Sequence, residues 1–155
     1  MSGCTNKAVQ NKPVSTKSTN GSVIKSFDGG KSWENKVNLG ENKNIGNVNV
    51  LSMAISNFDS RVLYIGTEKN GIYLTRNGGE LWEKTSFGAE RVYGIGLDFQ
   101  NAGVIYASGV FEKRGKIYKS LDEGKNWKEI YNANKDQLST PNSLREGMIL
   151  KIPAL

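Results

Sequence analysis

The octapeptide Ser120-Leu-Asp-Glu-Gly-Lys-Asn-Trp127 decides the fold, because the chain contains three versions of it. The other two are Ser26-Phe-Asp-Gly-Gly-Lys-Ser-Trp33 and Thr75-Arg-Asn-Gly-Gly-Glu-Leu-Trp82. In chain order we name the copies box 1, box 2 and box 3. Each has a hydroxyl residue, an Asp or Asn two positions on, one or two glycines and a closing Trp, and each follows a short β-prone run. Recurrence at a spacing of about 40–50 residues is typical of a repeat architecture.

Each box has the composition of a tight turn. An Asp or Asn side chain can accept hydrogen bonds from backbone N–H groups two residues on, and glycines can adopt positive φ. The hydroxyl can bond the turn from its other side, while the Trp covers it and buries apolar area. Catalysis by the box carboxylates fits less well, because carboxylates repeated at equivalent turns indicate scaffolding. We therefore assign structural roles to Ser26, Asp28, Gly30, Trp33, Thr75, Asn77, Gly79, Trp82, Ser120, Asp122, Gly124 and Trp127.

The segments between the boxes have the pattern of short antiparallel strands. Residues 49–55 are apolar enough to predict burial on both faces, residues 40–46 predict a polar loop, and box 1 has only a hairpin around it. Four strands in a unit of about 40–50 residues is the period of propeller blades. The prediction is an all-β, incomplete β-propeller of about two four-stranded blades plus a hairpin. The strands of the two full units are expected at residues 49–55, 62–65, 72–75 and 81–85, and at 92–97, 104–108, 116–120 and 126–130.

The boxes resemble the Asp-box, or bacterial neuraminidase repeat, which joins the last two strands of a propeller blade. The phrases Val62-Leu-Tyr-Ile-Gly66 and Val104-Ile-Tyr-Ala107 are similar to those of sortilin-like and photosystem-assembly-factor-like propellers. The resemblance extends from Ser22 to about residue 131, and it implies that the boxes lie on the blade rim, away from the ligand face. Two positions depart from the pattern, since Asn77 replaces the Asp of box 2 and Glu123 replaces a Gly of box 3.

Residues 126–153 resemble the second half of a LysM domain, and we call residues 132–155 the LysM-like tail. That resemblance implies a helix over residues 127–136 and a closing strand over 148–152. Box 3, in contrast, predicts a strand at Trp127, so strand and helix are both open for residues 126–136. A closed propeller usually needs at least four blades, and open terminal blades expose edges and apolar faces. We therefore expect a truncated propeller whose tail covers part of its open end, with a homo-oligomer or a fragment of a larger propeller as alternatives.

The N-terminal segment resembles an exported lipoprotein. Ser2-Gly-Cys4 is similar to the end of a lipoprotein signal, which makes Cys4 a lipidation candidate, although no apolar signal region precedes it in this chain. Residues 5–20 are mostly Asn, Lys, Ser, Thr and Gln, a composition that predicts a disordered tether. The domains are then a tether at 1–20, Asp-box blades at 21–131 and the LysM-like tail. We expect an extracytoplasmic location, with membrane contact only through a lipid at Cys4.

The amino-acid composition excludes several classes of catalytic and metal site. The 155 residues include no His and one Cys, which excludes Ser-His-Asp and Cys-His catalysis, an internal disulfide and most zinc sites. We therefore expect neither a cofactor nor a metal. The net charge is +6, but the 21 Lys and Arg are scattered, so nucleic acid is not an expected partner. The sequence contains no run of about 18 apolar residues, so it predicts no membrane-spanning segment.

Three functions follow from these features. The first is non-catalytic protein binding or scaffolding through loops at the blade ends, and the second is binding of cell-wall glycan (peptidoglycan) through the LysM-like tail. The third is a carbohydrate-active enzyme of the sialidase or xyloglucanase kind, which would need two carboxylates about 5–10 Å apart. Asp59 and Asp98 both follow first strands and are the candidates for one rim. Repeating tyrosines indicate packing between blades, in place of a sugar-stacking face: Tyr64, Tyr73, Tyr93, Tyr106 and Tyr118.

Overall fold

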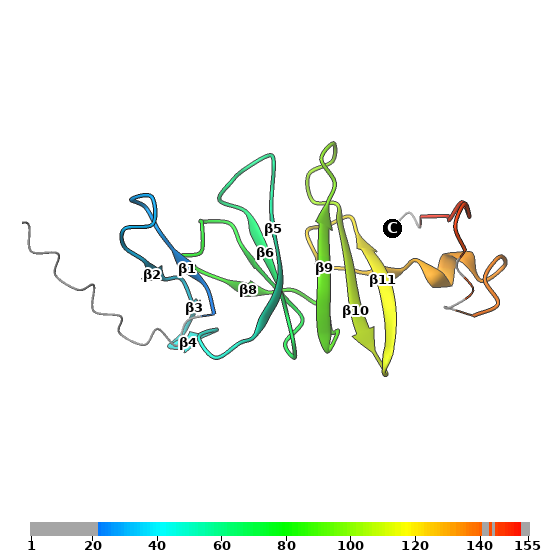
Figure 1. Ribbon diagram of the computed structural model, residues 1–155, viewed down its shortest axis with the longest axis horizontal. Coiled ribbons are helices and arrows are strands. Elements are labelled where there is room, and N and C mark those ends of the chain that lie inside the picture. Colours follow the sequence, from blue (N-terminus) through cyan, green and yellow to red (C-terminus); the bar gives the residue numbers. More distant parts are fainter. Residues whose placement is uncertain (1–21, 141–142, 144, 153–155) are drawn as a thin grey trace, which may run out of the picture.

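The computed structural model describes residues 22–140, 143 and 145–152. In these residues almost all regular structure is β, and the strands form antiparallel sheets that stand side by side along the molecule (Figure 1). The predicted tether lies outside the described residues. The elements are β1 (Ile24–Lys25), β2 (Glu34–Asn35), β3 (Asn38–Gly40), β4 (Lys43–Asn44), β5 (Val50–Ile55), β6 (Leu63–Thr67), β7 (Ile72–Thr75), β8 (Glu83–Lys84), β9 (Arg91–Leu97), β10 (Ile105–Phe111), β11 (Arg114–Ser120), β12 (Lys128–Glu129) and the 3₁₀ helix η1 (Tyr131–Asn134).

The sheets confirm the incomplete propeller. Strands β5 to β8 and β9 to β12 each form a four-stranded meander, while β1 and β2 form a hairpin. We call the hairpin blade 1 and the two full sheets blade 2 and blade 3. Each box joins the last two strands of its blade. The three copies also share one register. In each, the residue three positions after the box Trp donates its N–H to the carbonyl of the apolar residue three positions before the box. The distance is 2.9 Å each time: Lys36 to Val23, Thr85 to Ile72 and Ile130 to Ile117.

The predicted polar loop at 40–46 contains a further hairpin, formed by β3 and β4. Glu41 and Asn42 both have positive φ, 49° and 61°, which is the geometry of a tight two-residue hairpin turn. Asn38 Oδ1 accepts the Gly40 N–H at 2.8 Å and fixes the turn from one side. The hairpin brings Ile45 to a fully buried position, so this segment contributes to the core. Its polar composition hid the strands, because the hairpin depends on Asn geometry and not on an apolar run.

Two apolar clusters form the core, and each lies between two blades. The cluster between blades 1 and 2 contains Val23, Ile45, Ile65, Tyr73 and Trp82. The cluster between blades 2 and 3 contains Tyr64, Ile72, Leu74, Phe87, Ala89, Val92, Ile105 and Ala107. Neighbouring residues of β6 and β7 enter opposite clusters because successive side chains of a strand point to opposite faces. The middle of blade 2 is therefore buried on both faces.

Strand β5 is not buried on both faces, which corrects the prediction. Its residues alternate, and Leu51, Met53 and Ile55 are exposed, with exposed fractions of 42%, 50% and 56%. We call these three residues the apolar strip. The opposite face packs toward β9, where the Ser52 hydroxyl donates to the Val92 carbonyl at 3.0 Å. The strip is exposed because the described part of blade 1 has only the two outer strands, which do not reach across it.

The structure resolves the conflict at residues 126–136 in favour of a short strand, β12, which lies within the predicted strand at 126–130. Strand β12 extends only to Glu129, and the helix predicted over 127–136 is a four-residue 3₁₀ turn. The strand predicted over 148–152 is also wrong, because these described residues form no β-ladder. They are held by the buried Asn134, whose amide donates to the Lys151 carbonyl at 2.8 Å and accepts the Lys151 N–H at 2.6 Å.

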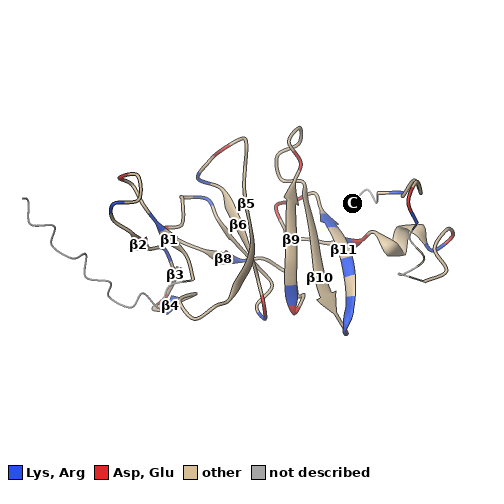
Figure 2. Ribbon diagram, in the orientation of Figure 1, with Lys and Arg blue, Asp and Glu red and all other residues tan. Residues whose placement is uncertain are grey.

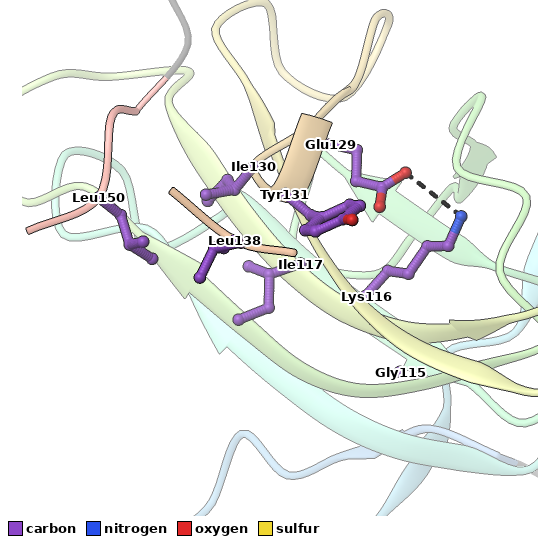
Figure 3. A pocket seen from close by; sticks show the side chains of 8 residues that line it. All are labelled: Gly115, Lys116, Ile117, Glu129, Ile130, Tyr131, Leu138 and Leu150. Atoms are coloured by element: carbon purple, nitrogen blue, oxygen red, sulfur yellow. Dashed lines mark hydrogen bonds and ion pairs between the residues drawn. The ribbon is translucent and has the colours of Figure 1, made fainter. Parts of the chain in front are cut away.

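The tail covers part of the open face of blade 3, as we expected. Leu138 and Leu150 share an apolar pocket with Ile117 of β11 and Ile130 (Figure 3). The residues equivalent to Ile130 are Lys36 in blade 1 and Thr85 in blade 2, and each contacts the box of the next blade. A Cβ placed on Gly79 would lie 3.0 Å from Lys36, and one on Gly124 would lie 3.1 Å from Thr85. The tail therefore lies on the side of blade 3 that a following box would contact.

Equivalent residues in blades 2 and 3 test this account of the core. Ile72 has an exposed fraction of 0% and Ile117 one of 50%, although they occupy the same register position. We expect Ile72→Ala to lower the free energy of unfolding by about 2–5 kcal/mol, because it leaves a cavity between two blades. Ile117→Ala should cost about 1 kcal/mol. Urea unfolding of both variants gives the comparison, and equal losses would contradict the assignment of the core to the inter-blade faces.

Candidate functional site

The same hydrogen bonds close all three boxes. The first hydroxyl accepts the N–H of the glycine four residues on, at 2.7 Å in box 1, 3.0 Å in box 2 and 2.9 Å in box 3. It also donates to the Asp or Asn Oδ1 at 2.9 Å in each copy. Besides this hydroxyl, the same Oδ1 accepts a backbone N–H from the residue four positions on, and not two as predicted: Ser32 to Asp28 at 2.9 Å, Leu81 to Asn77 at 2.9 Å and Asn126 to Asp122 at 2.8 Å.

Two successive residues of each box have positive φ. The second is always a glycine, with φ of 89° at Gly30, 95° at Gly79 and 86° at Gly124. The first is a glycine in boxes 1 and 2, but in box 3 it is Glu123, with φ of 58°. A side chain in this conformation costs about 1–2 kcal/mol. Glu123 also accepts a hydrogen bond from Arg76 of box 2 at 2.8 Å, which links the boxes of neighbouring blades.

The box tryptophans differ in burial because they contact the preceding blade. Trp82 has an exposed fraction of 1%, and its Nε1 donates to the Lys36 carbonyl of blade 1 at 2.8 Å. Trp127 is half-buried and packs on Phe87, which follows β8, with ring centroids 4.5 Å apart. Trp33 has an exposed fraction of 55%, since no blade precedes blade 1 in the described chain. Box residues thus take part in blade packing as well as in the turn.

The box carboxylates are held in their ionised form. Hydrogen bonds from the Ser32 hydroxyl, the Ser32 N–H and the Ser26 hydroxyl lower the pKa of Asp28 to about 2. Hydrogen bonds from the Asn126 side chain and backbone likewise lower the pKa of Asp122. Box 2 achieves the same turn with the neutral Asn77, so the turn requires an acceptor oxygen and not a proton-transfer group.

The carboxylates predicted on one rim do share a pocket. Asp59 and Asp98 line a pocket of about 190 Å³ between the loops that join β5 to β6 and β9 to β10. We call it the rim pocket; the residues important for its chemistry are Phe58, Asp59, Tyr64, Asp98, Gly103 and Glu123. Arg61 lowers the pKa of Asp59 by hydrogen bonding, and the backbone N–H of Gln100 is the main cause of the lowered pKa of Asp98. Neither carboxyl therefore has the raised pKa of a general acid.

The repeated tyrosines divide between packing and surface. Tyr64 and Tyr73 are buried in opposite clusters, and Tyr118 packs against Phe87 with ring centroids 5.4 Å apart. Tyr106 is half-buried, with the Lys119 ammonium 5.8 Å from its ring centroid. Tyr93 is exposed, because its side of β9 has no blade over it among the described residues. Packing between blades thus accounts for three of the five.

Charges are distributed along the whole length of the described chain (Figure 2). Strand β11 carries Arg114, Lys116 and Lys119, and Lys116 pairs with Glu129 at 3.3 Å. Within the described ranges, no three His, Cys, Asp or Glu side chains come together to form a metal site. No helix in the same residues is long and apolar enough to cross a membrane. Cys4, the lipidation candidate, lies outside them.

Comparison with known proteins places these boxes and blades in a family. The model of the Sortilin-Vps10 family, described as sortilin, neurotensin receptor 3, matches residues 21–143. The chain belongs to the Sortilin-Vps10 family. The match spans blade 1, blade 2, blade 3 and the first part of the tail, and it confirms the sortilin-like resemblance of the boxes. No curated protein matches the chain.

One solved structure shares the fold, and two further solved structures are similar to a lesser degree. An ancestral GH74 enzyme is 21% identical with a TM-score of 0.56, and the match covers 72% of this chain and 15% of that one. YCF48 from Cyanidioschyzon merolae is 22% identical with a TM-score of 0.45, covering 61% and 25%. The GH74 enzyme of Niastella koreensis is 15% identical with a TM-score of 0.32, covering 69% and 26%. The Sortilin-Vps10 chain thus matches about a quarter or less of each of these proteins.

The carboxylate of box 1 gives a pH-dependent test. Because the pKa of Asp28 is lower in the folded chain than the ordinary value of 3.8, the carboxylate stabilises the box fully above about pH 4, and this contribution is lost as the pH falls toward 2. An NMR titration of its carboxyl carbon should show a midpoint of about 2. Ser32→Ala should move the midpoint toward 3.8, because the Ser32 hydroxyl is the largest cause of the shift.

Asp28→Asn is the control for the turn itself. It should leave the Ser26 and Gly30 amide signals of a closed turn in place, because Asn77 fills the same position in box 2. A midpoint near 3.8 in the unaltered protein would contradict the hydrogen-bonded geometry of box 1.

Proposed function

We propose that this chain is a non-catalytic repeat module that binds or scaffolds protein, and that the apolar strip on β5 is its main contact surface. The strip supports the proposal because it continues an interface that the chain already forms. Met53 pairs with Ile65 and Ile55 with Leu63 in the β5–β6 ladder, so each pair lies on one face of the sheet. Ile65 and Leu63 belong to the cluster between blades 1 and 2. The buried interface therefore extends directly into exposed apolar surface.

The repeat indicates what kind of partner fits the strip. Between blades 2 and 3, the first two strands of blade 2 pack over the first strand of blade 3. Blade 1 offers no equivalent of those two strands among the described residues, and β1 pairs only with β2 there. A partner that supplies an apolar β-strand pair would cover the strip and hydrogen-bond the free edge of β1. Strand addition of this kind is a common mode of protein recognition.

The state of the carboxylates supports a non-catalytic role. Asp28 and Asp122 are occupied by box turns, and Asp59 and Asp98 are held ionised by local hydrogen bonds. The sequence has no His to supply a base of neutral pKa. A carbohydrate-active enzyme is still our third-ranked function. The similarity to the ancestral GH74 enzyme, at 21% identity, supports the fold and says nothing about catalysis.

Glycan binding through the tail stays the second prediction. Ile130 and Leu138 are buried, and Asn134 is occupied by its bonds to Ile130 and Lys151, so these groups already have structural partners. We also propose, from Ser2-Gly-Cys4, that the natural protein is exported and attached to a membrane by a lipid on Cys4.

Charge placed on the strip should abolish protein binding. In capture from a membrane extract, Met53→Lys/Ile55→Lys should retain less than a tenth of the partner, because each buried apolar side chain contributes about 1.5–3 kcal/mol. The double variant should keep the far-UV CD spectrum of the unaltered protein, since both side chains are half-exposed. Light scattering after size-exclusion chromatography shows whether the partner is a second copy.

Ile149→Lys is the matched control, because Ile149 is an apolar residue of the tail with an exposed fraction of 87%. It should capture the same partner at the same level as the unaltered chain. Equal capture by the strip variant and this control would contradict the proposed surface.

A further inference from the structure

The rim pocket is formed by two loops that are tied to each other and to box 3. The Asn57 amide of the first loop donates to the Phe99 carbonyl of the second at 3.0 Å. The Glu123 N–H of box 3 donates to the Gly103 carbonyl at 3.0 Å. Backbone and side-chain bonds thus fix three walls of the pocket. A pocket with walls held in this way is formed before any ligand arrives, which reduces the cost of binding.

Tyr64 provides an unused polar group in the rim pocket. Its exposed fraction is only 3%, and no described residue forms a hydrogen bond with its hydroxyl. Across the described chain, no fully buried side-chain nitrogen or oxygen lacks a partner, so the Tyr64 oxygen keeps some accessible surface, and Tyr64 is one of the residues that line the pocket. Burial, with a smaller effect of Glu123, raises the pKa of Tyr64 to about 12. The phenol therefore stays protonated near neutral pH and can both donate and accept.

The charges around the pocket favour a cation. Three carboxylates line it, those of Asp59, Asp98 and Glu123. Asp59 pairs with Arg61 at 2.8 Å and Glu123 with Arg76 at 2.8 Å, whereas Asp98 accepts the N–H groups of Gln100 and Asn101. Those N–H groups carry no formal charge, and a carboxylate has about four acceptor positions. The charge of Lys119 also lowers the pKa of Asp98. A cation in the pocket would therefore use the acceptor positions of Asp98 that the two N–H groups leave open.

An aromatic ring also lines the pocket. Phe58 has an exposed fraction of 52% and belongs to the first loop. A guanidinium can stack on such a ring while it donates to carboxylates through its planar N–H groups. Acceptors on several walls suit an arginine, because arginine carries five donors in one plane.

We propose that the rim pocket binds the guanidinium of an arginine side chain presented by a protein partner. The carboxylates of Asp98 and Glu123 accept its N–H groups, the Tyr64 oxygen accepts another, and Phe58 covers one face of the plane. The inference rests on the proposed protein-binding function for the source of the arginine. The pocket itself uses residues that the apolar strip does not.

A titration with a blocked arginine, Nα-acetyl-L-arginine N-methylamide, tests the site by ¹H–¹⁵N NMR. The amides of Phe58, Gly103 and Glu123 should shift saturably, with a Kd of about 1–10 mM. Tyr64→Phe should weaken binding about threefold, because it removes only the hydroxyl. Asp98→Asn should weaken it about fivefold or more, because it removes the charge but keeps an acceptor for the turn. Added salt should weaken it further.

Tyr106→Phe is the matched control, since Tyr106 pairs with Lys119 in blade 3 as Tyr64 pairs with Leu74 in blade 2. It should bind the probe like the unaltered protein. The neutral isostere Nα-acetyl-L-citrulline N-methylamide should not bind. Equal binding of this isostere, or no saturable shift with the arginine probe, would overturn the proposal. Shifts caused by a cello-oligosaccharide but not by arginine would overturn it in favour of a glycan site.

The strip variant Met53→Lys/Ile55→Lys separates this inference from the proposed function. It should bind blocked arginine normally even where it fails to capture a protein. Loss of arginine binding in that variant would contradict the independence of the pocket. Loss of binding confined to Asp98→Asn and Tyr64→Phe would locate the guanidinium where we place it.

Discussion

The structure depends on one constraint, which is that a blade with apolar side chains on both faces needs a neighbour on both faces. The middle strands of blade 2 meet it, because Ile65 and Tyr73 enter one cluster while Ile72 and Leu74 enter the other. The outer blades have a neighbour on one face and are covered only in part on the other. Ile117 stays half-exposed where its blade 2 equivalent is buried, and the tail covers only one region of the end face. The apolar strip of β5 marks the same shortfall at the other end of the array.

The boxes connect this packing to the local turn. The first hydroxyl and the Asp or Asn oxygen accept backbone N–H groups of the turn. In boxes 2 and 3 one further N–H, of Gly78 or Glu123, donates to a carbonyl outside the box. The second glycine then allows the preceding blade to approach, since a Cβ at Gly79 or Gly124 would press on Lys36 or Thr85. One octapeptide thus closes a blade and sets its distance from the previous one. This dual role explains why Asn replaces Asp freely, while the second glycine is present in all three copies.

Most of the fold could be predicted because its signals are local. Box chemistry and β-prone runs lie within a few residues of one another, and they located the strands of both full blades. The exposure of Met53, the burial of Trp82 against Lys36 and the Asn134 bonds could not be predicted, because each depends on what another segment covers. For the site, the shared rim of Asp59 and Asp98 was predicted from their positions after first strands. The packing of Tyr64 between blades was predicted, but its position in the lining of the rim pocket was not, because that depends on the neighbouring loops.

Hydrogen–deuterium exchange of the backbone amides tests the central claim most directly. If coverage of both faces determines stability, the slowest exchange should occur in β6 and β7, in the middle of blade 2. The corresponding strands β10 and β11 of blade 3 should exchange faster, although their ladder is longer, and β1 should exchange fastest of these strands. Equal protection in β7 and β11, or greater protection in β11, would contradict the account and would mean that hydrogen bonding within each blade, and not packing between blades, stabilises the array.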